Sequence, residues 1–306
     1  SVHDAVSHGD DGLDLCPTLH PKTIIYNRIP KCASGSMNIF IEEANKRRPF
    51  VVGRSNIYNV RQLNDRSLAR YASRPFEASN CKNRPTRDQK AILSRHIFFL
   101  NFTQFSQPQP AYMNVIRDPV DRCVSRYYYE RDARGTVPDT MDMDRCMARG
   151  GPCRFTKWTS RDSVATGGGT RMAQMIEECS SNYLTRWFCG MEKKCHSGSR
   201  EALDQAKRNM RHAYAFVGLT EDMKTGFGML QLIFPDFFGD KDLPVDICNK
   251  CGIKAPPSPG EAPNGAAAPP EVVKKPNMLS PANRQVIASL NKMDVELYAY
   301  AKDLFW

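Results

Sequence analysis

The loop from Arg28 to Ser36 has the composition of an anion-binding turn. An apolar run, Thr23 to Ile29, leads into small and hydroxyl-bearing residues, and a helical pattern begins at Met37. A strand, a loop of small residues and a helix present backbone N–H groups and a helix N-terminus to an anion. Lys31 adds a positive charge. We expect an anion cradle here, and a merely structural turn between strand and helix is the alternative.

The residue order of this loop differs from that of a nucleoside-triphosphate P-loop. A P-loop follows the pattern G-x-x-x-x-G-K-[ST], with its lysine near the end. Here Lys31 comes first and only one glycine, Gly35, follows. The sequence therefore does not predict a Walker A site.

A second strand and helix supply another pair of anion-binding side chains. Ala111 to Ile116 predicts a strand and Val120 to Arg134 a helix; Arg117 follows that strand and Ser125 lies on the helix. Arginine binds phosphate through two parallel hydrogen bonds, and a serine hydroxyl can donate a hydrogen bond to the same group. Asp118 is typical of an N-cap, so an arginine that pairs with the helix cap is the alternative role of Arg117.

Strands and helices alternate along the rest of the chain. A third strand is expected at Tyr214 to Leu219, between a helix capped by Ser199 and a helix from about Asp222 to Phe234; Ser280 should open one long helix towards Phe305. This alternation predicts an α/β fold with a central parallel sheet flanked by helices. Such sheets bind ligands at the carboxyl ends of their strands, where the first two loops lie.

The chain has 306 residues, of which 41% are hydrophobic, enough for a sizeable core. We expect a tail at residues 1–22 and one domain at residues 23–306. A Gly-rich stretch near residues 166–181 and a Pro- and Ala-rich stretch near residues 255–270 predict flexible insertions. No apolar run is long enough to span a membrane, which also holds for the lumenal part of an anchored protein.

The formal net charge is +10, from 43 Lys and Arg against 33 Asp and Glu. This excess predicts an anionic partner, such as a nucleotide, a membrane surface or an acidic polysaccharide, and a solubilising surface is the alternative. No zinc-finger spacing, RNA-binding signature or basic region with heptads is present. Sequence-specific nucleic-acid recognition is therefore disfavoured.

Eleven cysteines include close pairs around turn-like segments, which predict small disulfide loops in an oxidising compartment. Zinc is the alternative, but it needs two paired ligand sets and only one C-x-x-C is present. The odd number leaves at least one thiol free or paired with another chain. The close pairs are Cys146 and Cys153, Cys189 and Cys195, and Cys248 and Cys251.

Several segments, in one order along the chain, match a known set of motifs. They are Pro30 to Ser36, Ser94 to Phe102, Val115 to Arg122 with Ser125, Phe188 to Gly190, Ser199 to Lys207, Phe216 to Gly218 and Phe237 to Gly239. Together they resemble the Golgi sulfotransferases and, more narrowly, the uronyl and heparan sulfate 2-O-sulfotransferases. The uronyl branch is the better match around His96.

The resemblance implies a P-loop-like sulfotransferase fold. It also implies transfer of a sulfuryl group from 3′-phosphoadenosine 5′-phosphosulfate to the 2-hydroxyl of a hexuronic acid in a glycosaminoglycan. Adenosine 3′,5′-bisphosphate is the product and no metal is needed. His96 corresponds to the catalytic base, because an imidazole with a pKa near 6.5 accepts a hydroxyl proton at neutral pH. Lys31 corresponds to the cation that stabilises the departing 5′-phosphate.

The remaining site residues follow from the same resemblance. The 5′-phosphate is assigned to Lys31, Cys32, Ala33, Ser34, Gly35 and Ser36, the 3′-phosphate to Arg117 and Ser125, a cofactor-covering segment to Lys274 and Lys275, and the acceptor side to Arg28. The family's disulfide positions coincide with Cys146–Cys153 and Cys189–Cys195, whereas Cys248 and Cys251 have no counterpart.

The chain also departs from the resemblance. Ser94 stands where the heparan branch has a second histidine, and the segment Gly135 to Asp144 is acidic where relatives are basic. These departures leave the choice of uronic acid and of glycosaminoglycan open.

By resemblance, we expect a Golgi lumenal protein, the lumenal part of a type II membrane protein whose signal-anchor is absent from this chain. A homo-oligomer, with a trimer as the family's example, and N-glycosylation at the sequon Asn101-Phe102-Thr103 are also expected. Two other function classes compete with this one. A catalytically silent glycosaminoglycan-binding relative is disfavoured by the presence of both Lys31 and His96. A nucleotide kinase is disfavoured because no Walker A order and no obvious magnesium carboxylate are present.

Overall fold

The computed structural model describes residues 21–148 except 59 and 87, residue 153, residues 171–240, residue 243 and residues 279–306. Most of the expected N-terminal tail, the 255–270 insertion, and Lys274, Lys275, Cys248 and Cys251 lie outside the described residues.

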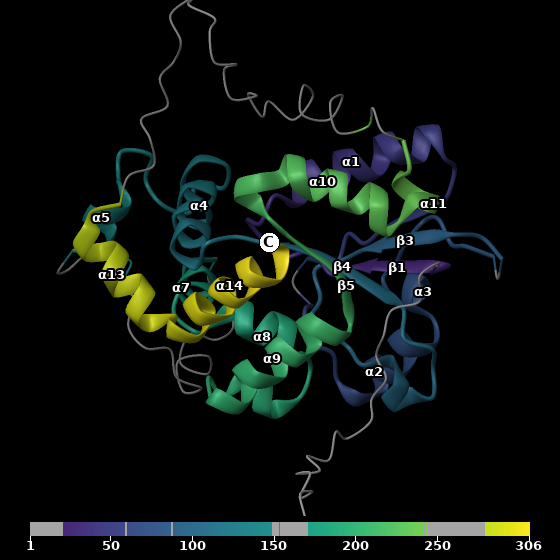
Figure 1. Ribbon diagram of the computed structural model, residues 1–306. Coiled ribbons are helices and arrows are strands. Elements are labelled where there is room, and N and C mark those ends of the chain that lie inside the picture. Colours follow the sequence, from purple (N-terminus) through teal and green to yellow (C-terminus); the bar gives the residue numbers. More distant parts are fainter. Residues whose placement is uncertain are drawn as a thin grey trace, which may run out of the picture.

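The centre of the fold is a five-stranded parallel sheet in the order β2-β3-β1-β4-β5 (Figure 1). The strands are β1 (Thr23–Tyr26), β2 (Val51–Arg54), β3 (Ala91–Ser94), β4 (Ala111–Ile116) and β5 (Tyr214–Leu219). All residues of β3 and β4 are buried, as expected for a parallel sheet covered on both faces. The predicted parallel α/β sheet flanked by helices is confirmed.

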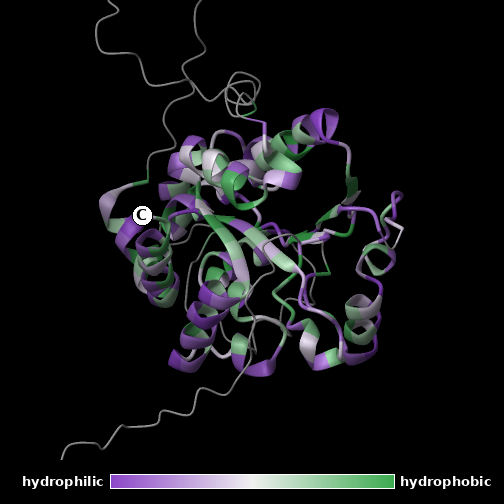
Figure 2. Cartoon of the chain, turned by 45° about the vertical axis from the view of Figure 1, so that its right-hand side comes forward, coloured by the Kyte–Doolittle hydropathy of each residue, from purple (hydrophilic) through white to green (hydrophobic). Residues whose placement is uncertain are grey.

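Helices cover both faces of the sheet. Figure 1 shows α1 and α10 on one side and α8 and α9 on the other, and Figure 2 shows polar residues along the outer turns of the helices. The helices are α1 (Ser34–Arg47), α2 (Asp65–Ser73), α3 (Pro75–Ala78), α4 (Pro119–Asp132), α5 (Met143–Met147), α7 (Arg171–Glu178), α8 (Tyr183–Cys189), α9 (Arg200–His212), α10 (Met223–Ile233), α11 (Pro235–Phe238), α13 (Pro281–Leu290) and α14 (Lys292–Phe305). The described residues also form the short 3-10 helices η1 (Phe102–Phe105), η2 (Lys193–His196) and η3 (Thr220–Asp222).

Side-chain caps fix the starts of α4, α9 and α13, where the sequence predicted Asp118, Ser199 and Ser280. The Asp118 carboxylate accepts from the backbone N–H groups of Val120 and Asp121 at 2.9 and 3.0 Å, and Pro119 opens α4. The Ser199 hydroxyl accepts from the backbone N–H of Ala202 at 3.3 Å and opens α9. Such caps satisfy amides that have no partner within the helix.

The C-terminal helix is interrupted, whereas the sequence predicted a single long helix. α13 and α14 meet at Asn291, whose side-chain amide donates to the carbonyls of Cys179 and Ile287 at 2.6 and 2.8 Å. Its side-chain oxygen accepts from the backbone N–H of Asn182 at 3.1 Å. These contacts with the α7–α8 connection hold Asn291 in a non-helical conformation and therefore break the helix.

The start of α8 is capped by a residue from the far end of the chain. Asn182 precedes α8 in a left-handed conformation and its side chain gives no cap to the helix. Instead the fully buried Asp294 of α14 accepts from the backbone N–H groups of Leu184 and Thr185 at 2.9 and 2.7 Å. The position of α8 thus depends on α14.

Residues 171–178, which the sequence analysis placed within a flexible insertion, form α7 and pack against α4. The two disulfides Cys146–Cys153 and Cys189–Cys195 are present, with Cα atoms 4.9 and 5.4 Å apart. Four other described cysteines are buried and free: Cys32, Cys81, Cys123 and Cys179.

Candidate active site

The first anion-binding loop connects β1 to α1 at the carboxyl end of the sheet. Lys31 and Ala33 both adopt positive φ angles, 68° and 50°, so the chain turns sharply before α1 begins at Ser34. No side chain caps α1, which leaves its first N–H groups open to an anion. A Cβ added at Gly35 would meet no atom within 4 Å, so the loop faces open space.

The residues of this loop divide between the core and the opening. The Cys32 thiol is fully buried, and burial raises its pKa to about 12, so it stays protonated and uncharged. Lys31, Ser34 and Ser36 are half-buried and Gly35 is exposed. An anion in this loop would therefore meet the ammonium, hydroxyls and backbone amides rather than the thiol.

The second loop lies against the first. β4 pairs with β1, and the backbone N–H of Arg117 at the end of β4 bonds to the Cys32 thiol. On α4, Ser125 and Tyr129 are one turn apart on one face. The Lys31 ammonium sits 4.2 Å from the centroid of the Tyr129 ring. The structure thus brings the Ser125 face of α4 and Arg117 to the Lys31 loop.

Positive charge converges on Lys31. Partial burial lowers the pKa of its ammonium, and the guanidinium groups of Arg126 and Arg117 lower it further. The carboxylate of Glu130 acts in the opposite direction, with a smaller effect than either guanidinium. A further anion beside Lys31 would therefore be favourable. The electrostatics of the loop therefore fit a phosphate-type ligand.

His96 lies two residues beyond β3, on the other side of β1. Its Nδ1 is 2.7 Å from the carbonyl oxygen of Arg28. Because a carbonyl only accepts, Nδ1 must carry the ring proton, and Nε2 keeps its lone pair. Burial, followed by the charge of Arg28, lowers the pKa of His96 to about 3. His96 is therefore neutral near pH 7 and is able to accept a proton.

Arg28 is buried beside His96. Its guanidinium donates to the Ser55 carbonyl at 3.2 Å and lies 5.6 Å from the centroid of the Tyr58 ring. Tyr58 is also 5.8 Å from the His96 ring and is 56% exposed. Tyr58 was not among the predicted site residues, because it lies in a segment without a motif.

A buried polar network fixes the end of β1 just before Arg28. The Asn27 carbonyl accepts from Trp187 Nε1 at 2.6 Å and from the Asn114 side chain at 2.8 Å, and the Asn27 amide donates to the Tyr214 hydroxyl at 2.8 Å. Trp187 of α8 also meets the His96 ring edge-on at 6.4 Å. This network was not predicted from the sequence. The one available signal was a polar residue, Asn27, in an otherwise apolar strand region.

Gly190 ends α8 where only glycine fits. Its φ is 118°, and a Cβ there would lie 2.7 Å from the carbonyl oxygen of Phe99. The same segment is held by a hydrogen bond of 3.0 Å from the Phe99 N–H to the Trp187 carbonyl. The Phe188-Cys189-Gly190 motif thus fixes the chain that follows His96.

The other predicted residues lie apart from the two loops or outside the described residues. Asn101 caps η1 by accepting from the Thr103 N–H at 3.0 Å. Lys274 and Lys275 lie in the segment that the structure does not describe. A separate pocket of about 470 Å³ lies between α1 and β2; it is lined by both Glu42 and Lys46 and by no residue of the two loops.

Within the described residues, no three His, Cys, Asp or Glu side chains are grouped closely enough to hold a metal ion. In the same part of the chain, no helix has the length and apolar character needed to cross a membrane.

Comparison with known proteins identifies the family. The model of the sulfotransferase family matches residues 18–301, nearly the whole chain. The chain belongs to the sulfotransferase family. Among curated relatives of this sulfotransferase, human uronyl 2-sulfotransferase is 26% identical over 248 residues, which cover 76% of this chain and 52% of the relative. Heparan sulfate 2-O-sulfotransferase 1 of Xenopus laevis is 34% identical over 223 residues, which cover 70% of this chain and 55% of the relative. The sulfotransferase chain thus spans about half the length of these relatives.

Proposed function

We propose that this sulfotransferase transfers a sulfuryl group from 3′-phosphoadenosine 5′-phosphosulfate to the 2-hydroxyl of a hexuronic acid in a glycosaminoglycan. One observation carries the proposal: the hydrogen bond from His96 to the Arg28 carbonyl joins the candidate base to the loop that bears Lys31. A proton acceptor and a cation thus belong to neighbouring strand ends, β3 and β1.

The donor fits the residues of the two loops. Lys31 and the backbone from Cys32 to Ser36 would hold the 5′-phosphate of the donor. The first N–H groups of α1 have no side-chain cap, and the space beside Gly35 is open. Arg117 and Ser125 would hold the 3′-phosphate. Lys274 and Lys275 would cover the donor from the undescribed segment. When bound, the donor supplies the sulfuryl group.

The chain's own residues supply the rest of the chemistry. His96 Nε2 takes the proton of the acceptor hydroxyl as its oxygen bonds to sulfur, and the Nδ1–H donated to Arg28 steadies the imidazolium that forms. Lys31 stabilises the negative charge that gathers on the 5′-phosphate as the bond from sulfur to the bridging oxygen breaks. The mechanism assigns no role to a metal.

The acceptor class follows from relatives and from charge. Relatives are named uronyl 2-sulfotransferase and heparan sulfate 2-O-sulfotransferase, and heparan sulfate is a polyanion. The net charge of +10 suits such a partner. Arg28, beside His96, is the residue we assign to the acceptor, because a guanidinium matches a uronic carboxylate.

We further propose that the protein works in the Golgi lumen as a homo-oligomer, with a trimer as the first form to test. The two disulfides suit an oxidising compartment. Asn101 is the proposed site of N-glycosylation, and Thr103, the third residue of its sequon, is exposed.

The decisive experiment combines the purified protein with labelled sulfate donor and a panel of desulfated heparan, dermatan and chondroitin chains. Digestion of the products to disaccharides should place the new sulfate at position 2 of a uronic acid. Label on a hexosamine, or label on none of the chains, would contradict the proposal.

A further inference from the structure

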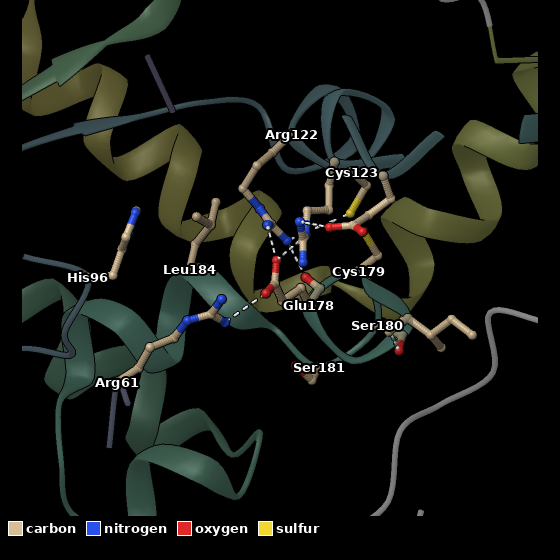
Figure 3. Close-up of polar contacts among 12 residues, drawn as sticks. Arg61, His96, Arg122, Cys123, Glu178, Cys179, Ser180, Ser181 and Leu184 are labelled. Atoms are coloured by element: carbon tan, nitrogen blue, oxygen red, sulfur yellow. Dashed lines mark hydrogen bonds and ion pairs between the residues drawn. The ribbon is translucent and has the colours of Figure 1, made fainter. Parts of the chain in front are cut away.

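One fully buried carboxylate, that of Glu178 at the end of α7, gathers three arginines from two other segments (Figure 3). The Arg61 guanidinium is 2.7 Å from Glu178 Oε1, the Arg126 Nε is 2.9 Å from Oε2, and the Arg122 Nη1 is 3.8 Å from Oε2. Arg122 also donates to the Glu178 backbone carbonyl. Arg61 belongs to the connection between β2 and α2, and the other two arginines belong to α4.

The carboxylate stays ionised in this buried place. Burial alone would raise the pKa of Glu178, but the charges of Arg61, Arg126 and Arg122 together hold it below its usual value. A buried charge is tolerated only when it is paired and hydrogen-bonded. Glu178 and its arginines therefore form one electrostatic unit in which the loss of the carboxylate would leave buried positive charge uncompensated.

Each of the three arginines also acts on a different residue of the candidate site. Burial lowers the pKa of Lys31, and the charge of Arg126 lowers it further; burial and Arg28 lower the pKa of His96, and the charge of Arg61 adds to this. Burial raises the pKa of the Cys32 thiol, and the charge of Arg122 offsets part of that rise. Figure 3 shows His96 on the Arg61 side of the cluster.

Backbone geometry links the same cluster to the site. The Arg61 carbonyl accepts from the backbone N–H of Phe98 at 3.2 Å, two residues beyond His96. On α4, Arg126 directly follows Ser125. One carboxylate therefore lies between the segment that carries the base and the helix that faces the anion-binding loop.

We propose that Glu178 is a positioning residue of this site. Its ion pairs hold Arg61, and with it the segment that carries His96, in a fixed position relative to the Ser125 face of α4. A donor bound beside α4 and the base His96 would then keep a fixed relative position. The inference rests on the proposed function, because the relative position of α4 and His96 matters for catalysis only if a donor binds beside α4. A carboxylate needed solely for folding is the competing explanation.

The test compares Glu178→Gln with Glu296→Gln. Glu296 also pairs with two cations, Arg200 at 2.7 Å and Lys207 at 2.6 Å, but it is only half-buried on α14, and neither of these partners is assigned to the site. Binding of adenosine 3′,5′-bisphosphate is measured by calorimetry, and the fold is checked by circular dichroism and thermal unfolding.

The two explanations predict effects of opposite sign. Removing a negative charge would by itself tighten the binding of an anion. We expect Glu178→Gln instead to weaken binding by about tenfold or more, because the α4 face is no longer held in place, and Glu296→Gln to stay within about twofold of the parent. Folded Glu178→Gln protein that binds the bisphosphate as tightly as the parent, or more tightly, would overturn the inference.

A charge-conserving variant covers the case in which Glu178→Gln does not fold. Arg126→Lys keeps the positive charge but loses the planar fork that reaches both Glu178 and Glu130. We expect its affinity for the bisphosphate to fall at least about fivefold, and unchanged affinity would count against positioning. A parent protein that binds no bisphosphate would instead refute the proposed function itself.

Discussion

His96 and Arg28 are joined by a hydrogen bond of 2.7 Å between the imidazole Nδ1 and the backbone carbonyl oxygen. The bond fixes the tautomer of the ring and leaves Nε2 as the only nitrogen able to accept a proton. It also ties the end of β3 to the loop that reaches Lys31 three residues later. The arrangement of base and cation is therefore set by main-chain geometry, which a side-chain substitution at Arg28 would leave in place.

His96→Ala should lower the transfer rate by about 100-fold to 10,000-fold, because the acceptor hydroxyl loses its base. Binding of adenosine 3′,5′-bisphosphate should stay within about twofold of the parent, since His96 is proposed to act on the acceptor and not on the donor. Rates with labelled donor and calorimetry check both statements. His212→Ala, an exposed histidine at the end of α9, is the matched control. Parental activity in His96→Ala would refute the base assignment.

Lys31→Ala should reduce transfer by at least about 100-fold, because no other group is assigned to the charge on the leaving phosphate. The fold should persist, since the Lys31 side chain is only half-buried and packs on the Tyr129 ring. Single-turnover rates measure the loss of transfer, and circular dichroism checks that the variant stays folded. Lys46→Ala, on the exposed end of α1, should leave the rate unchanged.

Arg117→Ala should weaken binding of adenosine 3′,5′-bisphosphate by about 10-fold to 100-fold, the usual cost of a lost charge-assisted hydrogen bond. Calorimetry measures the effect. Adenosine 5′-monophosphate, which lacks the 3′-phosphate, should bind the parent and the variant alike. Equal loss of affinity for both nucleotides would show that Arg117 does not act on the 3′-phosphate.

The stability of the unliganded protein should depend on pH through His96. Its folded pKa of about 3 lies below the ordinary value of 6.5, so between these values the unfolded chain binds the proton and the folded protein does not. The neutral form is present in both states above pH 6.5, and stability is lost as pH falls below that value. The loss at pH 5 is about 2 kcal/mol. Urea unfolding at pH 7 and pH 5 should show this loss in the parent and a smaller one in His96→Gln; equal losses would contradict it.

Non-reducing peptide maps should show the pairs Cys146–Cys153 and Cys189–Cys195. The thiols of Cys32, Cys81, Cys123 and Cys179 should react with iodoacetamide only after unfolding, because the folded protein buries them. Rapid labelling of Cys32 in the native protein would show that the first loop is more open than the structure has it.

The parts of the fold that the sequence predicts are those with strong local patterns. β4, β5 and α4 have long apolar runs or a clear Asp-Pro start, and all three lie where they are expected. β2 and β3 were missed, because each has only four residues, β2 contains Gly53, and neither lies in a longer apolar run like the one from Thr23 to Ile29 that predicted the equally short β1. A four-residue run gives too little periodicity to separate a strand from a loop.

The site shows the same division. The role of Lys31 was predicted from the composition of its loop, and that of His96 from the family resemblance of the segment around it. Trp187 and Glu178 were not, because their roles depend on partners far away in the sequence: Asn27 lies 160 residues from Trp187, and Arg61 lies 117 residues from Glu178. Contacts of that separation leave no periodic trace in a single sequence.

The capping of α8 by Asp294 determines the order in which parts of this protein can complete their folding. α8 carries Trp187, which braces Asn27 beside the loop of Arg28 and Lys31. During synthesis the first backbone amides of α8 cannot be capped until Asp294, which is about 110 residues further along the chain, has been translated. The nascent domain therefore completes its site only once residues 291–294 have emerged, and until then the first amides of α8 lack the Asp294 carboxylate as their acceptor.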